Sequence, residues 1–144
     1  MQDSGDRRSL SGPGSPSPEA ARVARLATVG SDGHPHVVPI CFVLDGATLY
    51  TAVDEKPKGT RVLQRLRDIE ANPDVTVLID HWDEDWSQLW WVQLRGRARV
   101  VALDGRVGGL LAAKYEQYER EPPGGPLIEI RIEQRREWRA TPRD

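Results

Sequence analysis

Alternation of apolar and polar side chains is clearest in the second half of the chain, over residues 89–101. One face of this run carries Trp90, Val92, Leu94, Ala98 and Val100. The other face carries Trp91, Gln93, Arg95, Arg97 and Arg99. A two-residue period predicts a β-strand with one face on a core. Gly96, in the middle of the run, predicts a β-bulge or a close approach of another backbone.

Further strands are predicted on both sides of this run. Residues 25–30, 48–53, 75–82, 127–133 and 137–140 each favour a strand. Residues 36–44 (HVVPICFVL) are nearly all apolar and predict a strand covered on both faces. Pro39 inside that strand favours an edge position or a bulge. Asp45-Gly46 predicts a tight hairpin turn.

Helices are predicted at 18–24, 60–71 and 105–118. In the second of these, the apolar face is formed by Val62, Leu63, Leu66 and Ile69. The polar face is formed mostly by Arg61, Gln64, Arg65 and Asp68. The third is weakened by Gly108-Gly109. Because hairpins outnumber possible crossovers, the order of elements predicts an antiparallel sheet curled into a barrel with a few packed helices.

Composition narrows the class of protein. Residues 1–17 are rich in Gly, Ser, Pro and charge, which predicts a disordered tail before a single domain at 18–144. The net charge of −2 gives no bulk attraction to nucleic acid or an anionic membrane. No apolar run approaches the roughly 20 residues that span a bilayer. One cysteine, Cys41, excludes an internal disulfide and fits the cytoplasm. Because Cys41 lies in a predicted apolar strand, we expect it to be an inert packing residue.

A basic segment lies where a predicted strand runs into a predicted helix. Lys56, Lys58 and Arg61 surround the expected helix start. Free backbone N–H groups and the helix dipole favour an anion at such a position, so the segment predicts a phosphate or carboxylate site. The alternative is a solvated surface loop, since Lys and Arg are usually exposed.

Four of the five tryptophans lie within residues 82–91, interleaved with acids. Tryptophan offers a rigid face for stacking a planar ring, so Trp82, Trp86 and Trp91 favour a cofactor pocket or a dimer surface. The alternative assigns Trp90 to the core and the others to a subunit interface. The acids fit no calcium or zinc motif, and no metal site is predicted. No hydrolytic or proton-transfer set is visible, so no catalytic residue is assigned. This pattern is typical of proteins whose chemistry belongs to a bound cofactor.

Three segments, 21–61, 72–101 and 129–140, resemble the pyridoxamine-phosphate-oxidase-like split-barrel flavoproteins. The run DHWDEDWSQLWWV (80–92) is most similar to the actinobacterial branch of coenzyme F420-dependent enzymes. The resemblance implies a mainly β fold: an antiparallel split β-barrel with two or three flanking helices. It also implies a homodimer with two cofactor sites at the subunit interface, holding F420 or, alternatively, FMN.

The resemblance also implies a set of cofactor-binding residues. The ring would lie beside the strand backbone of Val38, Pro39, Ile40 and Cys41. The ring and ribityl chain would be flanked by Thr51, Ala52 and Val53. The phosphate would be held by Lys56 and Lys58, with Thr60 and Arg61 at the helix start. Contacts to the ring or from the partner subunit would come from Trp86, Trp91 and Trp138.

The expected function is that of an oxidoreductase passing a hydride from reduced F420 to a small organic acceptor. Two alternatives stay open at this point. One is an FMN-binding oxidase or reductase of the same fold. The other is a non-catalytic carrier of a planar anionic cofactor.

Overall fold

The computed structural model describes residues 17–53 and 60–141, and the expected tail at 1–17 lies, apart from Ser17, outside this part of the chain. Seven strands form one antiparallel sheet in the order β2-β1-β5-β6-β7-β4-β3. The strands are β1 (Ala24–Val29), β2 (Pro35–Ile40), β3 (Val43–Asp45), β4 (Thr48–Ala52), β5 (Asp74–His81), β6 (Trp90–Val101) and β7 (Leu127–Arg139). The helices are α1 (Thr60–Ala71), the short 3-10 turn η2 (Trp86–Gln88), α2 (Gly105–Lys114) and α3 (Glu116–Arg120).

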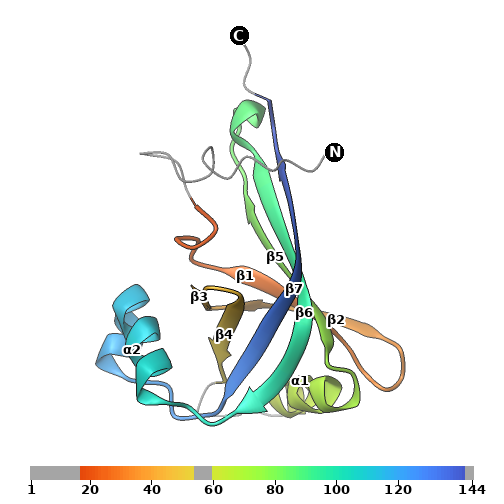
Figure 1. Cartoon of the computed structure of the whole chain (residues 1–144), viewed down its shortest axis with the longest axis vertical. Coiled ribbons are helices and arrows are strands. Elements are labelled where there is room, and N and C mark those ends of the chain that lie inside the picture. The colour runs from red at the N-terminus through yellow and green to blue at the C-terminus, as the bar shows by residue number, and fades with distance from the viewer. Residues whose placement is uncertain (1–16, 54–59, 142–144) are drawn as a thin grey trace.

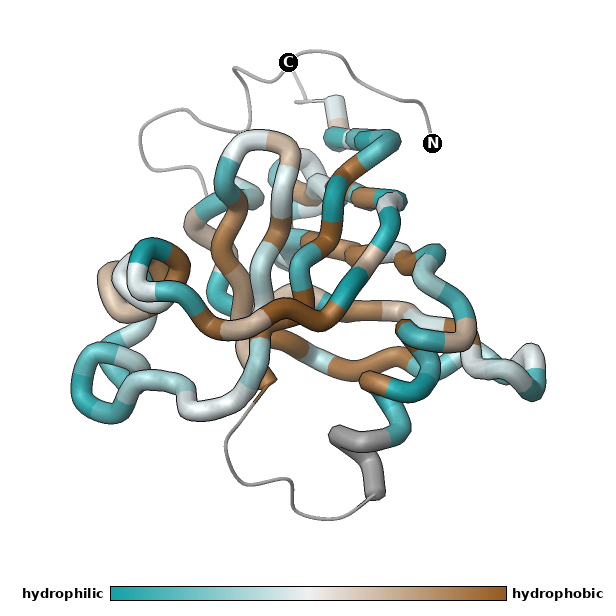
Figure 2. Tube along the Cα trace, turned by 60° about the horizontal axis from the view of Figure 1, so that its bottom comes forward, coloured by the Kyte–Doolittle hydropathy of each residue, from teal (hydrophilic) through white to brown (hydrophobic). Residues whose placement is uncertain are grey.

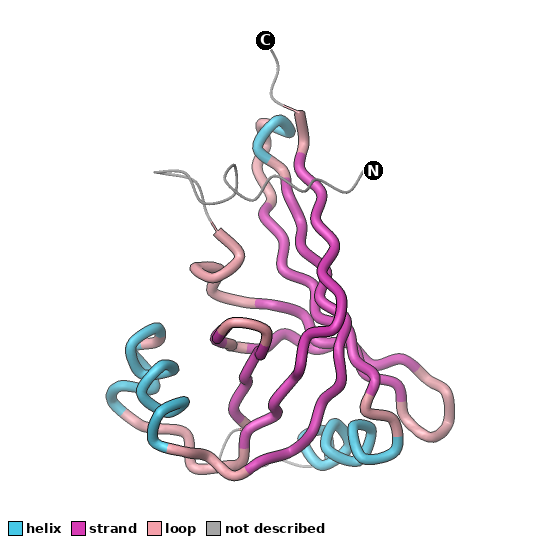
Figure 3. The backbone as a smooth tube through the Cα atoms, viewed as in Figure 1, coloured by secondary structure: helices cyan, strands magenta, loops and turns pink. Residues whose placement is uncertain are grey.

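The sheet is strongly curled, and its three longest strands project as an arm (Figure 1). Strands β5, β6 and β7 run into this arm, with η2 near its tip, whereas α1 and α2 lie at the opposite end of the molecule (Figures 1 and 3). The expected fold class, an antiparallel split barrel with flanking helices, is confirmed. No helix within the described residues is long and apolar enough to cross a membrane.

The core follows from the alternation on the strands. Trp90, Val92 and Leu94 on β6 are each at most 5% exposed, as are their counterparts Val75, Val77 and Ile79 on β5. Phe42 and Leu49 complete this main cluster. A second cluster packs Val107, Leu111 and Tyr115 of α2 and its end against β3, β4 and β7. In Figure 2 the hydrophobic positions accordingly concentrate on the strands that cross inside the molecule.

The apolar run 36–44 differs from its prediction. It is not one strand covered on both faces but two strands, β2 and β3, separated at Cys41-Phe42. Most of β2 is exposed, with Val37 at 63%. The reason is topological, because β2 and β3 occupy opposite ends of the sheet order and the chain passes from one end to the other within this run. The edge position that Pro39 predicts is confirmed.

Three other expected elements are also corrected. Residues 18–20 form a turn rather than the start of a helix, with the backbone N–H groups of Ala20 and Ala21 donating to the Ser17 carbonyl. The helix expected at 105–118 is interrupted at Tyr115, which has extended backbone angles. The two strands expected at 127–133 and 137–140 are one strand, β7, because a bulge keeps it paired with β6 along its length.

Gly96 lies where β6 and β7 change register. Arg95 pairs with Gln134 but Gly96 pairs with Ile132, so Glu133 is the extra residue. A Cβ atom built on Gly96 would come within 2.2 Å of the Arg131 carbonyl oxygen. Both the bulge and the close backbone approach expected at this glycine are therefore confirmed.

Lys114 gives folding stability a pH dependence. Its Nζ donates to the Phe42 carbonyl at 2.9 Å and lies 3.7 Å from the centre of the Phe42 ring. Burial, followed by the charge of Arg22, lowers the pKa of Lys114 from 10.5 to about 8. Between these values the unfolded chain binds more protons than the folded one, so the free energy of unfolding rises with pH in this window.

We therefore expect wild type to gain about 1–2 kcal/mol relative to Lys114→Met between pH 7 and pH 10, after allowing for the half-exposed amine. Denaturant unfolding of both proteins at the two pH values measures this. Burial raises the pKa of Tyr115, but that phenol is present in both proteins, so its effect cancels. A difference between the two proteins that stays constant with pH would contradict the assignment.

Candidate functional site

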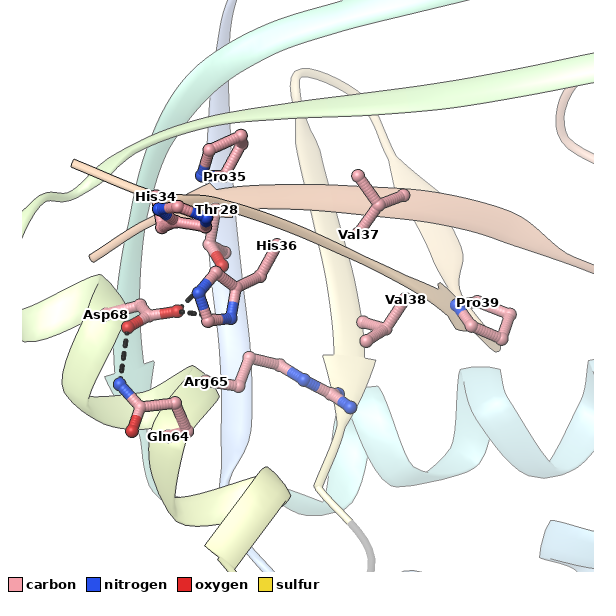
Figure 4. Close-up of a pocket in the computed structure, with 10 residues that line it drawn as sticks. All are labelled: Thr28, His34, Pro35, His36, Val37, Val38, Pro39, Gln64, Arg65 and Asp68. Carbon is pink, nitrogen blue, oxygen red and sulfur yellow. Dashed lines mark hydrogen bonds and ion pairs between the residues drawn. The ribbon is translucent and has the colours of Figure 1, made fainter. Parts of the chain in front are cut away.

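A pocket of about 810 Å³ lies between the edge strand β2 and helix α1 (Figure 4). Its wall on one side is formed by β2 and the turn before it, including His36, Val38 and Pro39. The opposite wall is formed by Gln64 and Arg65 of α1. These side chains come together because β2 pairs with β1 and α1 packs beside β1.

Asp68 lies at the base of this pocket and is only 2% exposed. Thr28 Oγ1 donates to its Oδ2 at 3.2 Å, and Gln64 Nε2 donates to its Oδ1 at 2.9 Å. His36 Nδ1 faces Oδ2 at 3.7 Å, an ion-pair distance. Gly30 leaves room for the carboxylate, since a Cβ atom there would come within 2.6 Å of Oδ1.

The burial of Asp68 corrects the helical-face prediction, which placed it mostly with the solvated side chains. A buried carboxylate is costly unless it is hydrogen-bonded, and here its partners come from β1, β2 and α1. No sequence spacing connects residues 28, 36 and 68, and the histidines gave no metal or catalytic motif. Only strand pairing and helix packing bring this group together.

The four residues expected beside the cofactor ring do not all lie in the pocket. Val38 and Pro39 line the pocket. Ile40 is 5% exposed and belongs to the main core. Cys41 is exposed in the break between β2 and β3, which corrects its prediction as an inert residue packed within a strand.

The residues expected beside the ribityl chain and phosphate follow along β4 and into α1. Thr51, Ala52 and Val53 are buried, at 2%, 9% and 4% exposure. The predicted phosphate ligands Lys56 and Lys58 lie outside the described residues. The basic segment connects the end of β4 to α1, whose first helical residues are Thr60 and Arg61. Gln64 and Arg65 follow about one helical turn later and line the pocket.

The tryptophans lie far from this pocket within one chain. Trp82 and Trp86, 63% and 66% exposed, contact each other edge to face at the end of the arm. Trp91 and Trp138 are opposite each other on β6 and β7. Trp90 is 5% exposed, in agreement with its expected core position. In Figure 1 the tip of the arm and α1 lie at opposite ends of the molecule, so Trp86 and the pocket are separate sites on a single chain.

The turn that precedes β2 brings charge to the rim of the pocket. The His34 backbone N–H donates to Asp32 Oδ1 at 3.0 Å, and this hydrogen bond lowers the pKa of the exposed Asp32 carboxyl. The pocket therefore presents the imidazoles of His34 and His36 on one side and the guanidinium of Arg65 on the helix wall. This arrangement suits a ligand with polar groups at its edge.

A curled seven-stranded antiparallel sheet with flanking helices defines the split-barrel class. The family profile described as pyridoxamine 5'-phosphate oxidase matches residues 17–139, and the chain belongs to this family. A search of curated proteins found no significant match.

Solved structures with similar folds have different described functions. An F420 reductase is 26% identical with a TM-score of 0.60, and the alignment covers 81% of this chain and 90% of that one. A candidate pyridoxamine 5'-phosphate oxidase from Listeria innocua is also 26% identical, with a TM-score of 0.59 and coverage of 83% and 90%. The haem storage protein HutZ from Vibrio cholerae, 17% identical over 85% and 88% with a TM-score of 0.65, is similar in fold alone.

Proposed function

We propose that this protein is an oxidoreductase that binds reduced F420 and promotes transfer of a hydride to a small organic acceptor. The pocket between β2 and α1 forms part of the cofactor site. The observation that carries this proposal is an exposed edge strand facing a helix whose start follows a basic segment. Membership of the family and the similarity to an F420 reductase support it.

The pocket fits the ring of a deazaflavin on two grounds. Strand β2 has β1 on one side and ends the sheet on the other, so its outer backbone N–H and C=O groups have no strand partner within the described residues. Such groups hydrogen-bond the heteroatoms of a planar ring. Val38 and Pro39 add apolar surface beside them. The volume of about 810 Å³ lies in the usual range for cofactor pockets.

The acidic part of the cofactor would lie toward the basic segment. In the sequence, Lys56 and Lys58 come between β4 and α1, and Arg61 is the second residue of α1. A helix start combines free N–H groups with a partial positive charge, which favours the phosphodiester of F420. Thr51, Ala52, Val53 and Thr60 would flank the path between ring and phosphate.

We also propose that the protein acts as a cytoplasmic homodimer. Trp82 and Trp86 expose more than 60% of their surface at the end of the arm, too far from the pocket of their own chain to contact its ligand. Large exposed aromatic side chains are typical of surfaces that bind another protein. In a dimer, Trp86 of one protomer would contact the cofactor site of its partner. Trp91 and Trp138 would support the base of the same surface.

Reduced F420 supplies a hydride when bound, and the chain has to bind it, orient its ring and keep water from the reacting face. An FMN-dependent oxidase or reductase is the second candidate, favoured by the family description. A carrier that binds the cofactor without turnover is the third.

A titration of cofactor-free protein with F420 and with FMN, followed by tryptophan fluorescence, tests the proposal. We expect saturable quenching by F420 at micromolar concentration and much weaker quenching by FMN. Preference for FMN would establish the second candidate instead. Binding of F420 with no oxidation of its reduced form across a panel of conjugated carbonyl and nitro compounds would favour the carrier. Quenching by neither cofactor would overturn the proposal.

A further inference from the structure

We propose that His36 delivers the proton that accompanies hydride transfer in the pocket between β2 and α1, and that Asp68 is the positioning residue that orients its ring. This inference rests on the proposed function, because it concerns the acceptor that the reduced cofactor would serve. It adds an acid–base group to a site for which the sequence suggested none.

The carboxylate of Asp68 is held by hydrogen bonds from two elements. Thr28 of β1 and Gln64 of α1 donate hydrogen bonds to its two oxygens, at 3.2 and 2.9 Å. The side chain is 2% exposed, and the absence of a side chain at Gly30 makes room for it. A carboxylate that is buried and hydrogen-bonded in this way has a fixed position, as an orienting group requires.

His36 connects this carboxylate with the pocket. Its Nδ1 faces Asp68 Oδ2 at 3.7 Å, and its side chain is 41% exposed. Figure 4 shows the other ring nitrogen turned away from Asp68, toward the side of the pocket where Val38 and Arg65 lie. One nitrogen is therefore directed at a buried carboxylate and the other at the ligand space, the arrangement of a general acid with an orienting partner.

The charged and titratable groups around His36 come from helix α1 and from the turn before β2. Asp68 and Arg65 face it from α1, and His34 and Asp32 from the turn before β2.

An acceptor that needs both a hydride and a proton fits this pair of residues, and we propose a carbon–carbon double bond conjugated to a carbonyl group. The hydride forms a new C–H bond at the far carbon, and the π electrons move to the carbonyl oxygen. The Nε2–H bond of His36 breaks as its proton passes to that oxygen, giving the enol. The neutral imidazole then regains a proton from water, and the oxidised cofactor releases its remaining proton. The acceptor gains two electrons and the cofactor loses two.

The first test needs no cofactor. Ring ¹⁵N chemical shifts of the three histidines report which nitrogen carries the proton, and His36→Gln identifies the signals of residue 36. Above the titration of the ring, we expect His36 of wild type to hold its proton on Nδ1, facing Asp68. In Asp68→Asn, whose amide N–H₂ donates instead of accepting, we expect the proton to move to Nε2. An unchanged tautomer in folded Asp68→Asn would overturn the positioning role.

The second test measures turnover of reduced F420 with a conjugated enone. We expect His36→Gln to lower kcat by about 100-fold and to abolish the alkaline limb of the pH profile, while F420 affinity changes less than twofold. Asp68→Asn should lower kcat by about tenfold with an unchanged KM. His81→Gln, at the end of β5 and outside the pocket, is the matched control and should keep wild-type turnover.

The outcomes separate this inference from the function on which it rests. If His36→Gln turns over reduced F420 as fast as wild type does, the inference is overturned and the proposed function stays in place. Absence of F420 binding and turnover in wild type would overturn both. Loss of turnover in His36→Gln with retained F420 affinity and the expected tautomer change in Asp68→Asn would support both.

Discussion

Gly96→Ala is expected to destabilise the protein by about 3 kcal/mol or to prevent folding. The added methyl carbon would come within 2.2 Å of the Arg131 carbonyl oxygen and 2.9 Å of its carbon. Both atoms belong to the backbone of β7, so the clash cannot be relieved by rotating a side chain. The two strands would have to separate at the bulge between Arg95 and Gly96. Denaturant unfolding followed by tryptophan fluorescence measures the loss.

Gly109→Ala is the matched control for this prediction. Gly109 is exposed within α2, and nothing lies within 4 Å of a Cβ atom built on it. The same change of one methyl group should stabilise the protein by about 0.5–1 kcal/mol, because alanine loses less backbone entropy than glycine in a helix. Equal effects of the two substitutions would show that the close approach of β6 and β7 does not exist in solution.

Lys58→Ala is expected to weaken F420 binding by at least about tenfold. A hydrogen bond to a charged group contributes about 1.5–3 kcal/mol, and its loss at the phosphodiester would have this effect. The prediction depends on the position of the residue in the sequence, between β4 and the start of α1. Isothermal titration of the variant with F420 measures the change directly.

Arg67→Ala removes the same charge from the exposed side of α1 and serves as the control. Its side chain does not line the pocket, so we expect F420 affinity within twofold of wild type. Such a result would separate a direct contact of Lys58 from a general loss of positive charge. Wild-type affinity in Lys58→Ala would remove this lysine from the site and turn attention to Lys56 and Arg61.

Much of the fold could be predicted from local patterns. The alternation on β5 and β6, the hairpin turn at Asp45-Gly46 and the helix at 60–71 appear as expected, because each reflects a period or a turn within a few residues. The errors fell where local signals were ambiguous. A run of apolar residues does not show where a strand ends. Residues 36–44 contribute to two strands, β2 and β3, which lie at opposite ends of the sheet order. Periodicity also does not show that the helix is interrupted at Tyr115, whose hydroxyl donates a hydrogen bond to the Arg22 carbonyl.

The sequence predicted only part of the lining of the candidate site. The sequence indicated Val38 and Pro39, which line the pocket, and a basic segment that leads into α1. It gave no sign that His36, Thr28 and Asp68 meet, because their contacts join a strand, an edge strand and a helix that are distant along the chain. Asp68 in particular has the spacing of a solvated residue but is 2% exposed in the folded protein.

The sequence by itself determined the fold class of this protein, a small antiparallel barrel, and it predicted an anion site at the start of α1 and a surface of exposed tryptophans. These features are encoded in neighbouring residues, through periodicity, turn chemistry and charge. The tertiary structure decided which side chains surround the pocket and where a charged side chain is held within the protein. Such properties depend on pairing between distant segments, since burial and electrostatic environment belong to the folded molecule and not to a stretch of chain.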